Sequence, residues 1–107
     1  MNERVNQIRT MLKTQPNDIF LHYSLAMELT STGCFDEASE AFTKCIELDK
    51  EYLAAYVEAG KSLRSAKRFD EARKIFKDAM KLSDKQGENH TRDYIRQQLE
   101  SLGESQQ

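Results

Sequence analysis

The sequence has little of what many specialised proteins depend on: it contains no tryptophan, one proline, four glycines and two cysteines in 107 residues. Cys34 and Cys45 are too few to hold a metal ion alone, and they do not indicate a disulfide-rich secreted domain. No apolar stretch approaches the roughly 18 residues that a membrane-spanning helix needs. The first residues carry Glu3 and no apolar segment next to small residues, which predicts that there is no signal peptide. We therefore expect a cytoplasmic protein that binds no membrane.

Residue patterns typical of catalysis are also missing. There is no glycine-rich phosphate loop, no Cys-x-x-Cys and no His-Glu-x-x-His, and the two histidines, His22 and His90, are far apart in the chain. Sixteen basic and eighteen acidic side chains give a net charge of −2, which argues against a nucleic-acid binder. We expect one globular domain that is not an enzyme and that needs no metal or cofactor.

What the sequence does contain is an internal repeat with a period of 34 residues. When residues 19–52 are aligned with 53–86, eight positions are identical, whereas composition alone would give about two. The identical pairs are Leu29/Leu63, Ser31/Ser65, Phe35/Phe69, Asp36/Asp70, Glu37/Glu71, Ala38/Ala72, Phe42/Phe76 and Leu48/Leu82.

Each repeat has the pattern of two helices joined by a short turn. Residues 19–32 carry apolar side chains at helical spacing, Gly33 interrupts the pattern, and a second helix is predicted from Phe35. Small residues predict that the helices approach closely beside the two repeated phenylalanines. These small residues are Ala26, Ala38, Gly60 and Ala72, and the phenylalanines are Phe42 and Phe76.

With these motifs the chain resembles the tetratricopeptide repeat family, whose 34-residue unit is a helix–turn–helix. The first half of the family motif corresponds to His22-x-x-Leu25-Ala26-x-x-Leu29 and Tyr56-x-x-Ala59-Gly60-x-x-Leu63, and the second half to Ala38-x-x-x-Phe42 and Ala72-x-x-x-Phe76. The resemblance implies an all-α fold, a right-handed stack of antiparallel helix pairs with about six helices, in a single domain.

The segments outside the two full repeats complete this arrangement. Residues 2–15 form an expected N-terminal half-repeat helix, because Pro16 precedes Lys50 by one period and Ile8, Met11 and Leu12 precede Phe42, Cys45 and Ile46 by the same interval. Residues 87–103 are expected to form a capping helix, with Thr91, Ile95, Leu99 and Leu102 as its apolar stripe. Residues 104–107 are expected to be a disordered tail.

The resemblance also implies where a partner would bind. The first helix of each repeat would line a concave side, and residues 19–32 contain a single formal charge, Glu28. The predicted binding residues are those outside the core motif: Phe20, Tyr23, Met27 and Val57, with Lys61 and Arg64 orienting the partner. We expect a short segment of a partner protein in this groove. Two alternatives stay open: the patch is covered within the chain, or it forms a homodimer interface.

Several residues carry more specific expectations. His22 takes a packing position and is interpreted as structural, and Cys45 is expected to be buried and inert. Some members of the family grip the acidic tail of heat-shock chaperones with Lys and Asn, but the matching positions here hold Tyr23, Met27 and Glu58, which disfavours that partner. Lys67 matches Gly33, so similar turns would require a positive φ at Lys67.

Charge is unevenly distributed along the chain. Residues 28–58 hold eight acids and two bases, whereas residues 64–81 hold seven bases and three acids. Solvated outer faces with i,i+4 pairs such as Glu40–Lys44 and Asp70–Lys74 are one interpretation. A basic end that steers an acidic peptide, or head-to-tail association, is the other.

Overall fold

The computed structural model describes residues 2–103, which form six α-helices and no strand. The helices are α1 (Glu3–Thr14), α2 (Ile19–Ser31), α3 (Phe35–Leu48), α4 (Leu53–Ser65), α5 (Phe69–Gln86) and α6 (Asn89–Ser101). The predicted all-α stack of about six helices is confirmed. The expected disordered tail, residues 104–107, lies outside the described residues.

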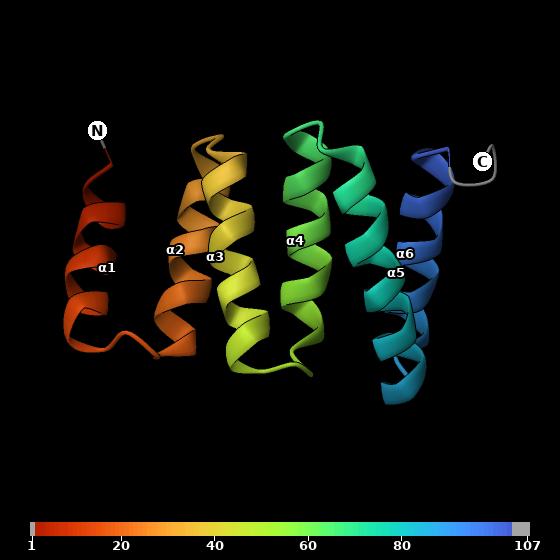
Figure 1. Ribbon diagram of the computed structural model, residues 1–107, viewed down its shortest axis with the longest axis horizontal. Coiled ribbons are helices and arrows are strands. Elements are labelled where there is room, and N and C mark those ends of the chain that lie inside the picture. The colour runs from red at the N-terminus through yellow and green to blue at the C-terminus, as the bar shows by residue number, and fades with distance from the viewer. Residues whose placement is uncertain (1, 104–107) are drawn as a thin grey trace.

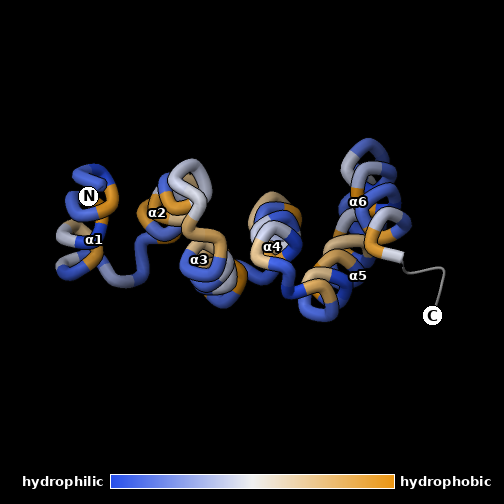
Figure 2. Tube along the Cα trace, turned by 90° about the horizontal axis from the view of Figure 1, so that it is seen from above, coloured by the Kyte–Doolittle hydropathy of each residue, from blue (hydrophilic) through white to orange (hydrophobic). Residues whose placement is uncertain are grey.

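The helices stand side by side in chain order, as Figure 1 shows. From above, α2, α4 and α6 lie along one side of the stack, and α3 and α5 lie along the other (Figure 2). Within residues 2–103, every extensive contact joins two helices that are consecutive in the sequence. The molecule is therefore elongated, with extents of 43 × 28 × 18 Å.

The core is built where the sequence places small residues opposite phenylalanines. Phe42 and Phe76 are completely buried, as are Ala38 and Ala72 one turn before them. The ring of Phe76 lies directly on Gly60, where an added Cβ would be only 2.5 Å from the ring atom Cε1. The glycine is needed there because a methyl group would overlap the ring.

The turns between the paired helices confirm the prediction for Lys67. Gly33 has a φ of 80° and Lys67 has a φ of 64°. Both turns close in the same way, because the Cys34 N–H donates to the Leu29 carbonyl over 2.9 Å and the Arg68 N–H donates to the Leu63 carbonyl over 2.8 Å. The second turn thus places a residue with a Cβ in the left-handed region, which favours glycine.

The N-terminal helix is less enclosed than the helices that follow it. Val5 and Ile8 of α1 are buried, whereas Met11, one period before the buried Cys45, is 43% exposed. The physical reason is that α1 packs mainly on α2, whereas Cys45, at the corresponding position of α3, is enclosed between α2 and α4.

The last helix, α6, packs against α5 of the second repeat. Ile95 and Leu99 of α6 are buried in one cluster with Phe76 and Ala79 of α5, and Leu102 packs against the same cluster. The Arg73 guanidinium donates a hydrogen bond over 2.9 Å to the Leu102 carbonyl at the end of α6. These contacts fix α6 beside α5 and leave its other side facing α4.

Candidate functional site

The concave groove is formed by α2, α4 and α6, the three helices on one side of the stack (Figure 2). Two hollows open on it, one between α2 and α4 and one between α4 and α6. Glu58 borders both hollows, so the two form a continuous surface across the middle helix. This groove is the candidate site for a partner.

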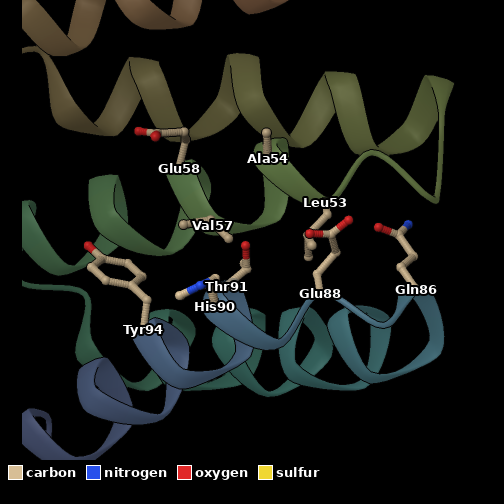
Figure 3. A pocket seen from close by; sticks show the side chains of 9 residues that line it. All are labelled: Leu53, Ala54, Val57, Glu58, Gln86, Glu88, His90, Thr91 and Tyr94. Atoms are coloured by element: carbon tan, nitrogen blue, oxygen red, sulfur yellow. The ribbon is translucent and has the colours of Figure 1, made fainter.

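The larger hollow, of 480 Å³, lies between α4 and α6. Leu53, Ala54 and Val57 provide an apolar floor on α4, as Figure 3 shows. Across from them are Thr91 and Tyr94 of α6, and Glu88 lies in the turn before that helix (Figure 3). The hollow therefore combines an apolar floor with carboxylates at its margins.

The smaller hollow, of 210 Å³, lies between α2 and α4. Met27 and Thr30 border it on α2, while Lys61 and Ser65 border it on α4. Met27 and Lys61 are predicted binding residues, and the structure brings them together here with Thr30 and Ser65.

Two predicted residues of α2 are uncovered. Phe20 is 74% exposed and Met27 is 41% exposed, so no described segment of the chain closes over them. The alternative that the patch is covered within the chain does not hold for these two side chains, because neither α1 nor α6 buries them. Large apolar side chains with such exposure are typical of contact surfaces.

Tyr23 has a different environment from the one predicted. Its ring meets Phe42 edge-on, with the centroids 5.5 Å apart, and stacks on Tyr52 at 5.2 Å. Burial, and secondarily the nearby Glu58, raises the pKa of the Tyr23 hydroxyl. Tyr23 is therefore half-buried, packed against the first core cluster.

The three predicted residues of α4 are engaged in different ways. Val57 is half-buried against the second core cluster while still lining the larger hollow. The Lys61 ammonium lies 3.4 Å from the Glu58 carboxylate, and the Arg64 guanidinium donates to the Gln98 side chain on α6. Both basic groups are thus held by the protein's own acceptors.

Sequence reasoning missed the residues that α6 and the turn before it contribute to the groove. Glu88, His90 and Tyr94 border the larger hollow, although residues 87–103 were interpreted only as a cap. These residues depart from the repeat motif, so the 34-residue alignment gave no signal for them. One signal in the sequence could have found Tyr94. It directly precedes the apolar-stripe residue Ile95, and consecutive residues of a helix lie on different faces, so Tyr94 is placed outside the buried stripe.

The other residue expectations concern single side chains. The His22 Nε2 atom lies 2.7 Å from the Pro16 carbonyl oxygen, which fits the structural interpretation of this histidine. Cys45 is buried, and burial raises the pKa of its thiol to about 11. Lys44 pairs with Glu47 in place of the expected Glu40, and Asp70 pairs with Arg73 in place of the expected Lys74, both at i,i+3 spacing. Among residues 2–103, no three histidine, cysteine or acidic side chains are grouped to bind a metal ion.

Comparison with known proteins identifies the repeat. A family model for the tetratricopeptide repeat matches residues 21–52 and again residues 53–86, which together make up more than half of the chain. The chain belongs to the tetratricopeptide repeat family. No curated protein matches the sequence. Within the described range, no helix of this tetratricopeptide repeat protein is both long and apolar enough to cross a membrane.

Solved structures share the fold at low identity. A protein from Bordetella parapertussis is 18% identical with a TM-score of 0.80, over 98% of this chain and 91% of that one. The TPR2B domain of yeast Sti1, solved in complex with pHsp70, is 21% identical with a TM-score of 0.81, over 94% and 81% of the two chains. The TPR domain of Arabidopsis OM64 is 25% identical with a TM-score of 0.75, over 91% and 78%.

Proposed function

We propose that this tetratricopeptide repeat protein is a non-catalytic adaptor that holds a short segment of a partner protein in its concave groove. The observation that carries the proposal is the exposure of Phe20 and Met27, seven residues apart on α2, together with the two hollows that meet at Glu58, of which Met27 borders the smaller. Apolar side chains at this spacing on a groove suit a helical or extended peptide. A cytoplasmic location is part of the proposal, supported by two free thiols, on Cys34 and Cys45.

The Sti1 domain supports a protein partner for this fold, since it has the same fold and was solved in complex with pHsp70. The partner of the present chain is proposed to be different in chemistry. Glu58 stands at the centre of the groove, where a carboxylate repels an acidic tail. The proposal therefore takes from the Sti1 domain only the binding of a protein partner.

The test selects binders from a displayed library of random peptides of about twelve residues. Peptides enriched on the wild-type protein would be synthesised, and their affinities measured by fluorescence polarisation. Met27→Glu is expected to weaken binding at least about tenfold, because a charge would be placed in the apolar contact. Met11→Glu is the matched control, because Met11 is 43% exposed against 41% for Met27 and lies on α1, away from the groove. Equal loss in both variants would contradict the proposal.

A second candidate is self-association through the same patch, favoured by the unusually high exposure of Phe20. An aromatic ring left in water gains free energy when it enters any apolar interface, including one with a second copy. Light scattering separates the two candidates. A monomer at high micromolar concentration leaves the groove free for another protein, whereas a dimer that Phe20→Glu dissociates assigns the patch to self-association.

A further inference from the structure

The larger hollow is acidic at its margins and apolar at its floor. Glu88 makes no ion pair with any residue in the described part of the chain, and its side chain lies at one end of the hollow (Figure 3). Glu58 lies at the other end (Figure 3), where its side chain is 22% exposed and its carboxylate is 3.4 Å from the Lys61 ammonium. Leu53 and Val57 lie on the floor between them.

The basic side chains around the hollow are committed elsewhere. Lys85 pairs with Glu51 at 2.7 Å, and Arg92 pairs with Asp84 at 3.2 Å. Arg64 donates to the Gln98 side chain. Lys61, which contacts Glu58, lines the smaller hollow instead of the larger one. The groups that line the larger hollow are therefore two carboxylates with neutral polar and apolar side chains, together with the imidazole of His90.

We infer that the hollow between α4 and α6 receives an arginine or lysine of the partner segment, next to an aliphatic residue. This inference rests on the proposed function and names the chemistry of its partner. Glu58 and Glu88 border the hollow from its two ends, so both carboxylates attract a cationic side chain into it and disfavour acidic segments. The aliphatic stem covers Leu53 and Val57, as long basic side chains do on apolar surfaces.

The exposed ring of Tyr94 adds a second reason to expect a cation. Tyr94 borders the hollow on α6, across from α4 (Figure 3). A guanidinium or ammonium group is attracted to the face of a tyrosine ring. The volume of 480 Å³ leaves room for the neighbouring aliphatic side chain as well.

The test uses the same displayed library and two double variants. Glu58→Gln/Glu88→Gln removes both carboxylates of the hollow. Glu40→Gln/Glu47→Gln is the matched control, because it removes two exposed carboxylates of α3 on the opposite layer of the stack. Melting temperatures of both double variants are measured first, so that affinities are compared between folded proteins.

Wild-type protein is expected to enrich peptides with Arg or Lys beside an aliphatic residue. The strongest of them is expected to bind the Glu58→Gln/Glu88→Gln variant about tenfold or more weakly, and the control variant within about twofold. Replacing the peptide arginine by neutral citrulline is expected to weaken binding to wild type but not to the Glu58→Gln/Glu88→Gln variant, which completes a double-mutant cycle.

The outcomes against the inference are distinct from those against the proposed function. Peptides that lack basic residues, yet lose affinity in Met27→Glu, would overturn the inference and leave the adaptor function standing. A citrulline effect of equal size in both proteins would overturn it too. If the protein self-associates and the Glu58→Gln/Glu88→Gln substitutions abolish this, a second copy of the chain occupies the hollow, which would also overturn the inference. Enrichment of no peptide at all would overturn both proposals.

Discussion

The hydroxyl of Tyr56 donates a hydrogen bond to the backbone carbonyl of Lys50 over 2.7 Å. One repeat earlier, His22 places its Nε2 atom 2.7 Å from the carbonyl of Pro16. The two side chains and the two carbonyls are each separated by one 34-residue period. A polar group of an aromatic side chain therefore links the first helix of each repeat to the turn that precedes it, and either histidine or tyrosine can do so.

Removing the Tyr56 hydroxyl tests the strength of this link. We expect Tyr56→Phe to lower the free energy of unfolding by about 0.5–1.5 kcal/mol, because the ring packing is kept and one hydrogen bond is lost. Urea unfolding measures the change. Tyr94→Phe is the control, since Tyr94 is on the groove surface with its ring partly exposed, and it is expected to be close to neutral. Equal effects at both positions would show that the Lys50 contact does not stabilise the fold.

Substitutions at the two equivalent turns are expected to have opposite effects. Lys67→Gly is expected to stabilise the protein by a few tenths to about 1 kcal/mol, because glycine adopts a φ of 64° without strain. Gly33→Lys is expected to destabilise it by a similar amount, and a Cβ at Gly33 meets no atom within 4 Å, so the cost is in the backbone alone. Paired urea unfolding curves measure both changes. Destabilisation by Lys67→Gly would contradict the left-handed conformation.

The contact between Gly60 and the Phe76 ring predicts a steric conflict. Gly60→Ala is expected to destabilise the protein by about 1–3 kcal/mol, because the added methyl overlaps a ring with no room to move. Phe76→Ala alone is expected to cost about 3–5 kcal/mol through the cavity that it leaves. In the double variant the methyl fills part of this cavity, so the two costs are expected to sum to more than the measured total. Additive costs would contradict the close contact.

The Cys45 thiol gives the protein a defined response to alkaline pH. Its ordinary pKa of 9.0 rises to about 11 in the folded state because burial disfavours the thiolate. Between these values the folded state keeps a proton that the unfolded chain has lost, so the free energy of unfolding falls as the pH rises. Cys45→Ala is expected to flatten this decline, and the completely buried Ala79 shows that alanine suits the same position of the second repeat.

Urea unfolding between about pH 8 and about pH 11 measures that slope. Burial also raises the pKa of the Tyr23, Tyr52 and Tyr56 hydroxyls, so some decline with the same sign is expected to remain above about pH 10 in both proteins. An identical slope in wild type and Cys45→Ala would mean that the thiol makes no contribution.

Tyr23 and Met27 are expected to separate fold from binding. Tyr23→Glu is expected to lower the melting temperature, because it removes the ring contacts with Phe42 and Tyr52 and buries a carboxylate in their place. Met27→Glu is expected to leave the melting temperature nearly unchanged, since that side chain is already in contact with water. Circular dichroism during heating measures both. An unchanged melting temperature for Tyr23→Glu would contradict the half-buried position of Tyr23 and indicate that its side chain lies on the groove surface.

The sequence made the repeated part of the fold predictable because the same contacts occur twice. The small residues beside Phe42 and Phe76, and the turn at Lys67, follow from aligning one repeat with the other. Tyr23 could not be placed in this way. Its stacking partner Tyr52 lies in the turn before α4, and the corresponding residue before α2 is Asp18, so the alignment holds no second copy of the contact.

Residues of the groove could be predicted from the sequence only where they belong to the two aligned repeats. Met27 and Lys61 share one position of the motif, and both border the smaller hollow. Glu88 and Tyr94 reach the groove because α5 runs for 18 residues, four more than α3, before α6 turns back beside it. After this extension the chain no longer follows the 34-residue repeat. The positions of the residues after Gln86 therefore depend on how α6 packs and cannot be found by aligning the repeats.

The serial arrangement of the helices has a kinetic consequence. Each extensive contact in the described chain forms between neighbours in sequence, so only short loops must close as structure grows. Folds dominated by such local contacts complete folding within about microseconds to milliseconds. The two core clusters are joined through Tyr56 and Ile75, which pack against both. A chain that has formed one repeat therefore already holds the surface on which the other one assembles, and nucleation at either end leads to the same native stack.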